Sequence, residues 1–313
     1  MAIADYIKIA RPSHWFKNIF IIPGILLAFY FEPETASQTS WLQLAAGIIA
    51  TCMVASANYV LNEILDAPAD KHHPDKAARP IPSGRVALPF AYAEWILLTL
   101  AGLALAGLFG KGLFFSCASL WIMGLIYNIP PVRSKDLPYL DVLSESINNP
   151  IRMAIGWYSA GAAQLPTLSV LLSYWMFGAF LMAVKRFAEL RHIADGARAA
   201  RYRKSFSFYN EERLLVSILF YVALFGMFSG VFIARYRVEL VLATPFVALA
   251  LASYFRIGFK PNSPAMNPED LWRYKSILAP ISLAFAACAV LLFFDLAEMR
   301  AWFAPAFQMR ALP

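Results

Sequence analysis

Four polar side chains with a constant spacing follow an apolar run near the N-terminal end of the chain. They are Asn58, Asn62, Asp66 and Asp70. Residues four positions apart lie on one face of a helix, so these oxygens stack for as long as the chain stays helical. We expect Pro68 to end or loosen that helix and to leave Asp70 on its C-terminal side. Carboxylate and amide oxygens suit Mg²⁺, which completes its shell with water and substrate phosphates, so the pattern favours a magnesium–diphosphate site.

The alternative for this stretch is a solvated loop of mixed charge. Its acids are followed at once by bases, namely Lys71, Lys76 and Arg79. Two adjacent histidines, His72 and His73, have no partner at ligand spacing, and we do not interpret them as metal ligands. Oxygen ligands alone do not separate Mg²⁺ from Mn²⁺.

A second polar group lies inside an apolar segment at helical spacing. It consists of Asp141, Glu145, Asn148 (or Asn149) and Arg152. Charged residues within a membrane segment are a functional-site hypothesis by default. The alternative is a Glu145–Arg152 pair that only holds helices together. Both polar groups contribute to the predicted metal ligands, which are Asn62, Asp66, Asp70, Asp141 and Glu145.

Several bases lie close to these acids in the sequence and are suited to phosphate charge. Lys185 and Glu189 lie one helical turn apart at the end of an apolar run, with Arg186 beside them. We interpret the more distant Arg198, Arg201, Arg203 and Lys204 as orientation signals or contacts to anionic lipid headgroups. The predicted catalytic residues are Asp66, Asp70, Asp141 and Lys185. The predicted substrate-binding residues are Lys17, Asn58, Lys76, Arg79, Tyr127, Arg133, Lys135, Asn148, Arg152, Arg186, Glu189 and Tyr209.

The elements that must position these residues are apolar helices. Hydrophobic types make up 60% of the 313 residues, charged types only 15%, and the mean hydropathy is +0.56. Soluble domains carry about 25% charged residues, so we expect most of the surface to face lipid. A helix needs about 20 apolar residues to cross a bilayer. The sequence offers nine such segments in one domain over 1–313, at 16–32, 42–61, 89–109, 112–128, 142–160, 166–184, 214–234, 239–256 and 276–295.

The distribution of positive charge predicts an orientation. With the N-terminus in the cytoplasm, 21 of the 27 lysines and arginines fall on the cytoplasmic side, five fall outside, and Arg152 lies within a span. This asymmetry follows the positive-inside rule and places both acidic groups on the cytoplasmic side, with the C-terminus outside. Because the bases lie in loops between apolar segments, we expect no nucleic-acid partner. We also expect no removable signal peptide.

Two longer motifs resemble those of the UbiA superfamily of membrane prenyltransferases. The stretch NEILDAPADKHHPDKAARPIPSG is similar to the first Asp-rich motif of that family, and YNIPPVRSKDLPYLDVLSE is similar to the second. The resemblance implies a bundle of nine helices with a lateral, lipid-facing cavity, and a Mg²⁺-dependent transferase with a diphosphate leaving group. Two positions depart from the pattern, because Glu63 and Glu145 stand where aspartate is usual.

Shorter stretches resemble one branch of this superfamily. RPSHWFKN, VKRFAEL and FYNEERLL are similar to the polyprenyl-phosphate phosphoribosyltransferases, which implies phosphoribosyl pyrophosphate as donor and a polyprenyl phosphate as acceptor in a bacterial inner membrane. The proline-rich loop at 127–135 is equally similar to that of the aromatic prenyltransferases, in which Tyr127, Trp157 and Tyr158 would stabilise an allylic cation. A transporter is the alternative that is not an enzyme. The sequence predicts no oligomeric state.

Overall fold

The structure is a computed structural model that describes residues 3–71, 76–193, 203–267, 271 and 273–303. Every regular element in these ranges is helical. The α-helices are α1 (Ile3–Ala10), α2 (Ile22–Phe31), α3 (Pro33–Gln38), α4 (Trp41–Asp70), α5 (Leu88–Leu108), α6 (Lys111–Asn128), α7 (Leu140–Ser146), α8 (Asn148–Ser159), α9 (Leu168–Ile193), α11 (Glu211–Tyr236), α12 (Thr244–Ile257), α13 (Lys275–Phe293) and α14 (Ala297–Trp302). The 3₁₀ segments are η1 (Pro12–Ile21), η2 (Ser134–Asp136), η3 (Lys204–Ser207), η4 (Val238–Ala243) and η5 (Pro264–Met266).

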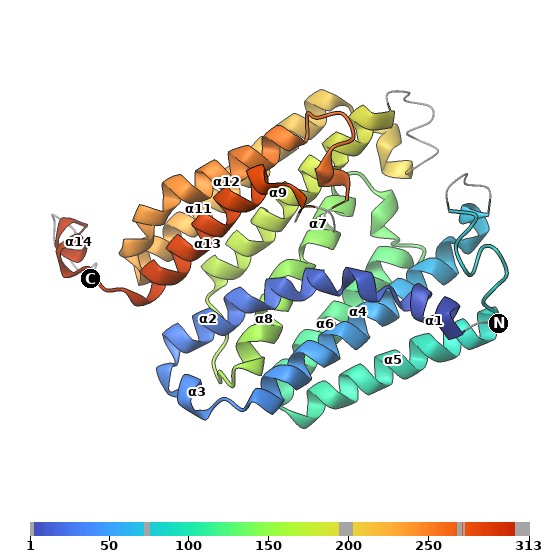
Figure 1. Ribbon diagram of the computed structural model, residues 1–313, viewed down its shortest axis with the longest axis horizontal. Helices are drawn as coiled ribbons and strands as arrows, with labels where there is room; N and C mark the ends of the chain where they lie inside the picture. The colour runs from blue at the N-terminus through green and yellow to red at the C-terminus, as the bar shows by residue number, and fades with distance from the viewer. Residues whose placement is uncertain (1–2, 72–75, 194–202, 268–270, 272, 304–313) are drawn as a thin grey trace, which may run out of the picture.

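The long helices form two groups that lie side by side (Figure 1). Helices α4, α5 and α6 pack on one another in the first group, and α9, α11, α12 and α13 form the second. Between them, α8 packs on α2 and α6, and α7 packs on α9. The C-terminal ends of α4, α6 and α9 lie at the end of the bundle opposite α3, so this end collects the loops that carry the polar motifs (Figure 1).

Two glycines allow α8 to approach the N-terminal helices closely. A Cβ atom at Gly24 would overlap the carbonyl oxygen of Met153, and one at Gly156 would overlap the carbonyl oxygen of Ile21. Small residues at such contacts are typical of helix packing in membranes, where close backbone approach replaces the hydrophobic effect as a source of stability. These contacts fix α8, and with it Arg152, against η1 and α2.

Seven stretches of the described residues are long and apolar enough to cross a membrane. They are Ile3–Phe31, Trp41–Asp70, Leu88–Leu108, Leu168–Ile193, Glu211–Tyr236, Val238–Ile257 and Lys275–Phe293. The nine predicted crossings are therefore not confirmed. The segments predicted at 112–128 and 142–160 fold as helices, but they are not among the seven.

The segment 142–160 is not one continuous helix. It lies on α7 and α8, with a turn at Ile147 between them. Pro150 explains the break, because proline has no N–H to donate to the carbonyl of Ser146 one turn earlier. The polar residues on both sides of the break face other helices of the bundle, where a membrane protein tolerates irregular backbone.

The prediction that Pro68 ends or loosens its helix is wrong. Helix α4 continues through Pro68 to Asp70, and the amide of Lys71 still donates to the carbonyl of Ala67 at 3.1 Å. One missing N–H does not stop a helix when its surroundings hold it, and the buried Ala67 and Asp70 on either side of Pro68 are packed. The four-residue spacing from Asn58 to Asp70 therefore stays on one helix face.

Candidate active site

Asp66 lies at the centre of the first polar cluster, near the end of α4. Arg133 Nη2 and Lys135 Nζ both donate to Asp66 Oδ1, each at 2.7 Å. Asn62 donates to Asp66 Oδ2 at 3.2 Å and to Asn128 Oδ1 at 2.6 Å. The loop after α6 thus closes over the end of α4 and sets two cations against one carboxylate.

Asp70, one turn further on, is held by the loop that follows α4. Arg79 Nη1 donates to Asp70 Oδ2 at 2.7 Å, and Lys76 Nζ lies 3.9 Å from Oδ1. Asp66 and Asp70 share a helix face, and the loop bases Lys76 and Arg79 lie beside Asp70. The role of this group in binding a ligand stays a prediction.

Glu63 precedes Asp66 by one turn of α4, but its carboxylate has other partners. It is 2% exposed, accepts a hydrogen bond from the amide of Ile81 at 3.3 Å, and lies 3.5 Å from Arg11 Nη2. The glutamate that departs from the family pattern therefore anchors the loop carrying Arg79 to the N-terminal segment.

Asp141 is the centre of the second cluster and is fully buried. Its Oδ2 accepts from Arg186 Nε at 3.0 Å and from the Ser205 hydroxyl at 3.1 Å, while Oδ1 accepts from the Tyr209 hydroxyl at 2.6 Å. Both carboxylate oxygens are thus occupied by protein donors. In this arrangement Asp141 positions Arg186, and its role as a metal ligand stays a prediction.

Tyr127 joins the two clusters. Its hydroxyl donates to Glu145 Oε2 at 3.1 Å, and Lys135 Nζ of the first cluster lies 5.9 Å from the centre of its ring. Arg186 Nη2 reaches the same Glu145 oxygen at 3.5 Å. A continuous set of contacts therefore runs from Asp66 through Lys135, Tyr127 and Glu145 to Arg186.

Further cations surround Glu145. Lys17 and Lys185 both act on it electrostatically, and Arg186 Nη1 also pairs with Glu189 at 2.9 Å. The Lys185 ammonium has no carboxylate within 4.0 Å among the residues that the structure describes. The Lys185 ammonium is therefore the cation of this cluster that is best placed to contact an anionic ligand.

Arg152, Asn148 and Asn58 lie apart from these clusters. Arg152 is 7% exposed and donates to Asn18 Oδ1 at 3.1 Å and to the carbonyl of Asn148 at 3.4 Å. Within the described ranges, no ion pair joins it to Glu145 within 4.0 Å, so the alternative of a direct Glu145–Arg152 pair is wrong. Asn58 donates to the carbonyl of Leu120 at 2.9 Å, where it holds α4 to α6.

The structure also adds residues that the sequence pattern did not single out. Asn128 accepts from both Asn62 and Lys135, the latter at 2.8 Å. Arg203, predicted as an orientation or headgroup contact, donates to the Tyr127 hydroxyl at 3.5 Å and lies 4.0 Å from Asp141. That prediction is wrong for Arg203, because the segment before α11 returns to the site. The neighbouring Lys204 side chain is 79% exposed, and Arg198 and Arg201 lie outside the described residues.

Of the three aromatic side chains proposed to stabilise an allylic cation, only Tyr127 contacts the polar clusters. Trp157 donates to the carbonyl of Gln164 at 2.8 Å and packs beside Phe31. Tyr158 packs against Gly112 at the start of α6. Both of these rings lie at the C-terminal end of α8, whereas Glu145 lies on α7, just before the N-terminal end of α8.

Burial changes the acidity of the two loop lysines in the first cluster. It lowers the pKa of Lys135 to about 8, although the Asp66 carboxylate opposes the change. Burial likewise lowers the pKa of Lys76, against the opposing effect of Asp70. A desolvated ammonium gains from an added anion, so both side chains are prepared to bind phosphate.

The donor set of the first cluster fits Mg²⁺. In the described part of the chain, no three acids, histidines or cysteines converge as a complete protein cage. Mg²⁺ does not need one, because it is usually bound through one or two carboxylates together with water and substrate phosphates. Asp66 and Asp70, with the amide of Asn62 beside them, provide such a set, and the partly exposed Glu145 provides a carboxylate from the second motif.

The chain is similar in sequence to two enzymes that carry the same name. The chain is 30% identical over 218 residues to decaprenyl-phosphate phosphoribosyltransferase of Mycolicibacterium smegmatis, covering 68% of this chain and 64% of that protein. It is 28% identical over 211 residues to the enzyme of the same name from Corynebacterium glutamicum, covering 64% of this chain and 59% of that protein. The chain thus spans about three fifths of the length of these relatives.

The fold is also that of a solved structure. A UbiA homolog from Archaeoglobus fulgidus, bound to GPP and Mg²⁺, superposes with a TM-score of 0.67 at 19% identity, covering 91% of this chain and all of that one. The family description "UbiA prenyltransferase family" matches residues 19–268. Because this match covers most of the chain and the helices agree with it, the protein is an integral membrane protein and belongs to the UbiA prenyltransferase family.

Proposed function

We propose that this protein is a Mg²⁺-dependent membrane transferase that moves 5-phosphoribose from phosphoribosyl pyrophosphate to a polyprenyl phosphate. Two relatives at 28% and 30% identity carry the name decaprenyl-phosphate phosphoribosyltransferase. The N-terminal RPSHWFKN and the later VKRFAEL and FYNEERLL support the same branch. The chemistry of the site supports a diphosphate donor independently of these names.

The observation that carries the proposal is the contact of both acidic motifs with Tyr127. Asp66 reaches Tyr127 through Lys135, and Glu145 accepts the tyrosine hydroxyl directly at 3.1 Å. A single diphosphate is small, so carboxylates from two motifs can bind its metal ion together only if they line the same binding site. The bases in between would then contact its oxygens.

Asn62, Asp66, Asp70 and Glu145 are the residues that would hold Mg²⁺. Bound there, the ion would supply positive charge to the departing diphosphate. The protein cations take the remaining phosphate charge: Lys76 and Arg79 beside Asp70, Arg133 and Lys135 beside Asp66, and Lys17, Lys185, Arg186 and Arg203 around Glu145. Such preorganised charge stabilises the transition state because it needs no rearrangement during the reaction.

The transfer itself exchanges one bond for another at the anomeric carbon of the ribose. The bond to pyrophosphate breaks, the electron pair leaves with pyrophosphate, and an oxygen of the lipid phosphate forms the new bond. That phosphate is already ionised at neutral pH, so no strong general base is required. The protein residues bind and orient the two anions and offset the charge that develops on the leaving group.

We further propose that the chain crosses the membrane nine times, with α6 and the α7–α8 pair as the two additional crossings. The polar residues of α7 and α8 face protein, so they do not prevent a crossing. The excess of lysine and arginine on one side supports an active site in the cytoplasm. The bacterial relatives support a location in the inner membrane.

The test is a transfer assay with the purified protein. One reaction contains labelled phosphoribosyl pyrophosphate and a polyprenyl phosphate, and another contains a labelled allylic diphosphate and aromatic acids, each with Mg²⁺ or with a chelator. We expect Mg²⁺-dependent entry of label into the lipid phase in the first reaction only. Label transfer in the second reaction alone would make the protein an aromatic prenyltransferase. Substrate flux into vesicles without turnover would make it a transporter.

A further inference from the structure

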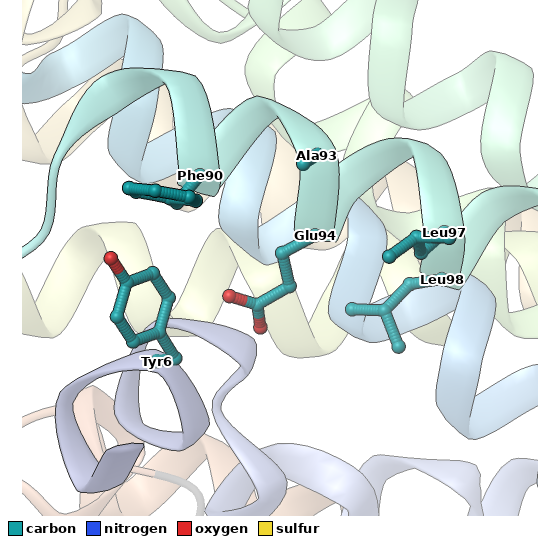
Figure 2. A pocket seen from close by; sticks show the side chains of 6 residues that line it. All are labelled: Tyr6, Phe90, Ala93, Glu94, Leu97 and Leu98. Carbon is teal, nitrogen blue, oxygen red and sulfur yellow. The ribbon is translucent and has the colours of Figure 1, made fainter. Parts of the chain in front are cut away.

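A second site lies on the outer face of the bundle, between α1 and α5. A pocket of about 660 Å³ is lined there by Tyr6, Phe90, Ala93, Glu94, Leu97 and Leu98. Figure 2 shows Glu94 extending from α5 towards α1, with the rings of Phe90 and Tyr6 on one side and Leu97 and Leu98 on the other. None of these six residues belongs to the clusters around Asp66 and Asp141.

Glu94 is the one polar side chain of α5 in this pocket. Its position destabilises the folded protein unless a ligand pairs with the carboxylate. Its Oε2 atom is buried and has no hydrogen-bond partner among the residues described. The acids of the candidate active site differ in this respect, because Asp66, Asp70 and Asp141 each bond to a cation. A carboxylate oxygen that is buried without a partner is destabilising, whereas a bound cation offsets that cost.

The remaining walls of the pocket are apolar and open to the bilayer. Phe90 is 59% exposed and Leu97 is 66% exposed, and both lie on α5, one of the apolar stretches long enough to cross a membrane. An acyl chain that lies along Leu97 and Leu98 would be in contact with the hydrocarbon of the membrane. Phe90 and Tyr6 offer aromatic faces that attract a cation.

The helix α1 sets the depth of the pocket in the membrane. Within the apolar stretch Ile3–Phe31, residues 12–31 suffice to cross about 30 Å of hydrocarbon, which allows α1 to lie at the water–lipid boundary. Its exposed Lys8 and the pair between Asp5 and Arg85 at 3.1 Å are consistent with this position. Because Tyr6 of α1 lines the same pocket as Glu94, the carboxylate is at the level of lipid headgroups.

We propose that this pocket binds an aminophospholipid, with its primary ammonium group on Glu94 and an acyl chain along Leu97 and Leu98. An ammonium group offers three N–H donors and a positive charge, which match an unpaired carboxylate between aromatic rings. An anionic lipid without an amine would place negative charge against Glu94. The site therefore distinguishes lipids by headgroup, and it does not depend on the transfer reaction proposed above.

The experiment measures lipid binding to the full chain in detergent by native mass spectrometry. Phosphatidylethanolamine and phosphatidylglycerol with the same acyl chains are added in turn to the wild type and to Glu94→Gln. We expect the wild type to retain phosphatidylethanolamine about tenfold more strongly than phosphatidylglycerol, and Glu94→Gln to lose that preference. Glu212→Gln is the matched control, because it removes an exposed carboxylate at the start of α11 and should leave the preference unchanged.

A second variant keeps the charge and fills the space. Leu97→Trp should reduce retention of phosphatidylethanolamine while Glu94 remains in place, and because Leu97 is exposed this change should not prevent folding. Equal retention of the two lipids by the wild type would overturn the proposal. So would an unchanged preference in Glu94→Gln, since the carboxylate would then have no part in recognition.

Discussion

Lys135 Nζ lies 2.7 Å from Asp66 Oδ1, although the two residues are 69 positions apart in the chain. Arg133 reaches the same oxygen at the same distance. Asp66 thus holds two cations in a partly buried place, and Arg133 also pairs with Asp136 at 3.1 Å. A phosphate that binds the two bases would leave the carboxylate available to a metal ion, so donor and metal are expected to bind together.

Asp66→Asn should lower turnover by about 10²-fold or more, because it removes one preorganised charge from the leaving-group site. The concentration of Mg²⁺ needed for half-maximal rate should rise at the same time. Both quantities are read from transfer assays over a range of Mg²⁺ concentrations.

The control for Asp66→Asn is Glu211→Gln. Glu211 forms an exposed pair with Arg191 at 2.8 Å, and such surface pairs contribute little. Turnover of Asp66→Asn close to that of the control, with the same Mg²⁺ dependence, would exclude Asp66 as a ligand.

Tyr127→Phe should lower kcat/KM by about tenfold or more, because it removes a hydrogen bond to a charged group. The variant keeps the ring near Lys135 but loses the hydroxyl that donates to Glu145. Tyr127→Leu removes the ring as well and should be more impaired. If Tyr127→Phe has wild-type kinetics, the contact between the two motifs has no functional role.

Arg203→Ala and Lys204→Ala test whether the residues just before α11 belong to the active site, as the contacts of Arg203 indicate, or contact lipid headgroups, as the sequence predicted. Arg203 contacts Tyr127 and lies 4.0 Å from Asp141, whereas Lys204 is exposed and pairs with Asp136 at 3.4 Å. We expect Arg203→Ala to lower kcat/KM for the donor by about tenfold or more, and Lys204→Ala to change it by less than about fivefold. Equal effects would return Arg203 to the group of headgroup contacts.

The parts of the site that lie on one helix could be predicted from the sequence. Asn62, Asp66 and Asp70 share a face of α4 because their spacing matches the helical repeat, and the structure keeps them together. Pro68 was misleading because proline disfavours a helix locally, while packing around the helix end is a property of the whole fold. The break at Ile147, by contrast, follows a local signal, Pro150, which the sequence interpretation did not use.

Contacts between distant segments could not be predicted from spacing. Ser205 and Tyr209 occupy the oxygens of Asp141 from 64 and 68 positions away, which requires the segment before α11 to fold back onto α7. No periodic pattern contains that information. The sequence therefore identified Asp141 as chemically unusual but could not reveal that protein donors already surround it.

Gly156→Ala should lower the free energy of unfolding of the protein in detergent by about 1–3 kcal/mol. The added methyl group would overlap the Ile21 carbonyl oxygen and push α8 away from η1. Gly226→Ala on α11 is the matched control. A Cβ there meets no atom within 4 Å, so alanine should be neutral or stabilise the helix by up to about 1 kcal/mol. Relative to the wild type, the melting temperature of Gly156→Ala should fall, and that of Gly226→Ala should stay the same or rise. Identical melting temperatures for the two variants would contradict the close packing at Gly156.

Asp141→Asn provides the sharpest distinction between a metal ligand and a positioning residue. Breaking a buried pair by removing one charge is expected to cost about 3–5 kcal/mol, because Arg186 then lacks one of its buried partners. The melting temperature should therefore fall clearly, while the protein that stays folded keeps its Mg²⁺ dependence. Asp66→Asn should show the reverse, with a changed Mg²⁺ dependence and a smaller change in stability.

A double variant makes this distinction independent of the overall loss of activity. If Asp141 acts by pairing with Arg186, then Asp141→Asn combined with Arg186→Gln should be less destabilised than the sum of the single variants, because neither charge is left without its partner. A metal ligand would produce no such coupling in stability. An unchanged melting temperature in Asp141→Asn, together with a higher Mg²⁺ requirement, would mean that Asp141 turns towards the ion when the donor binds, as the second motif predicted.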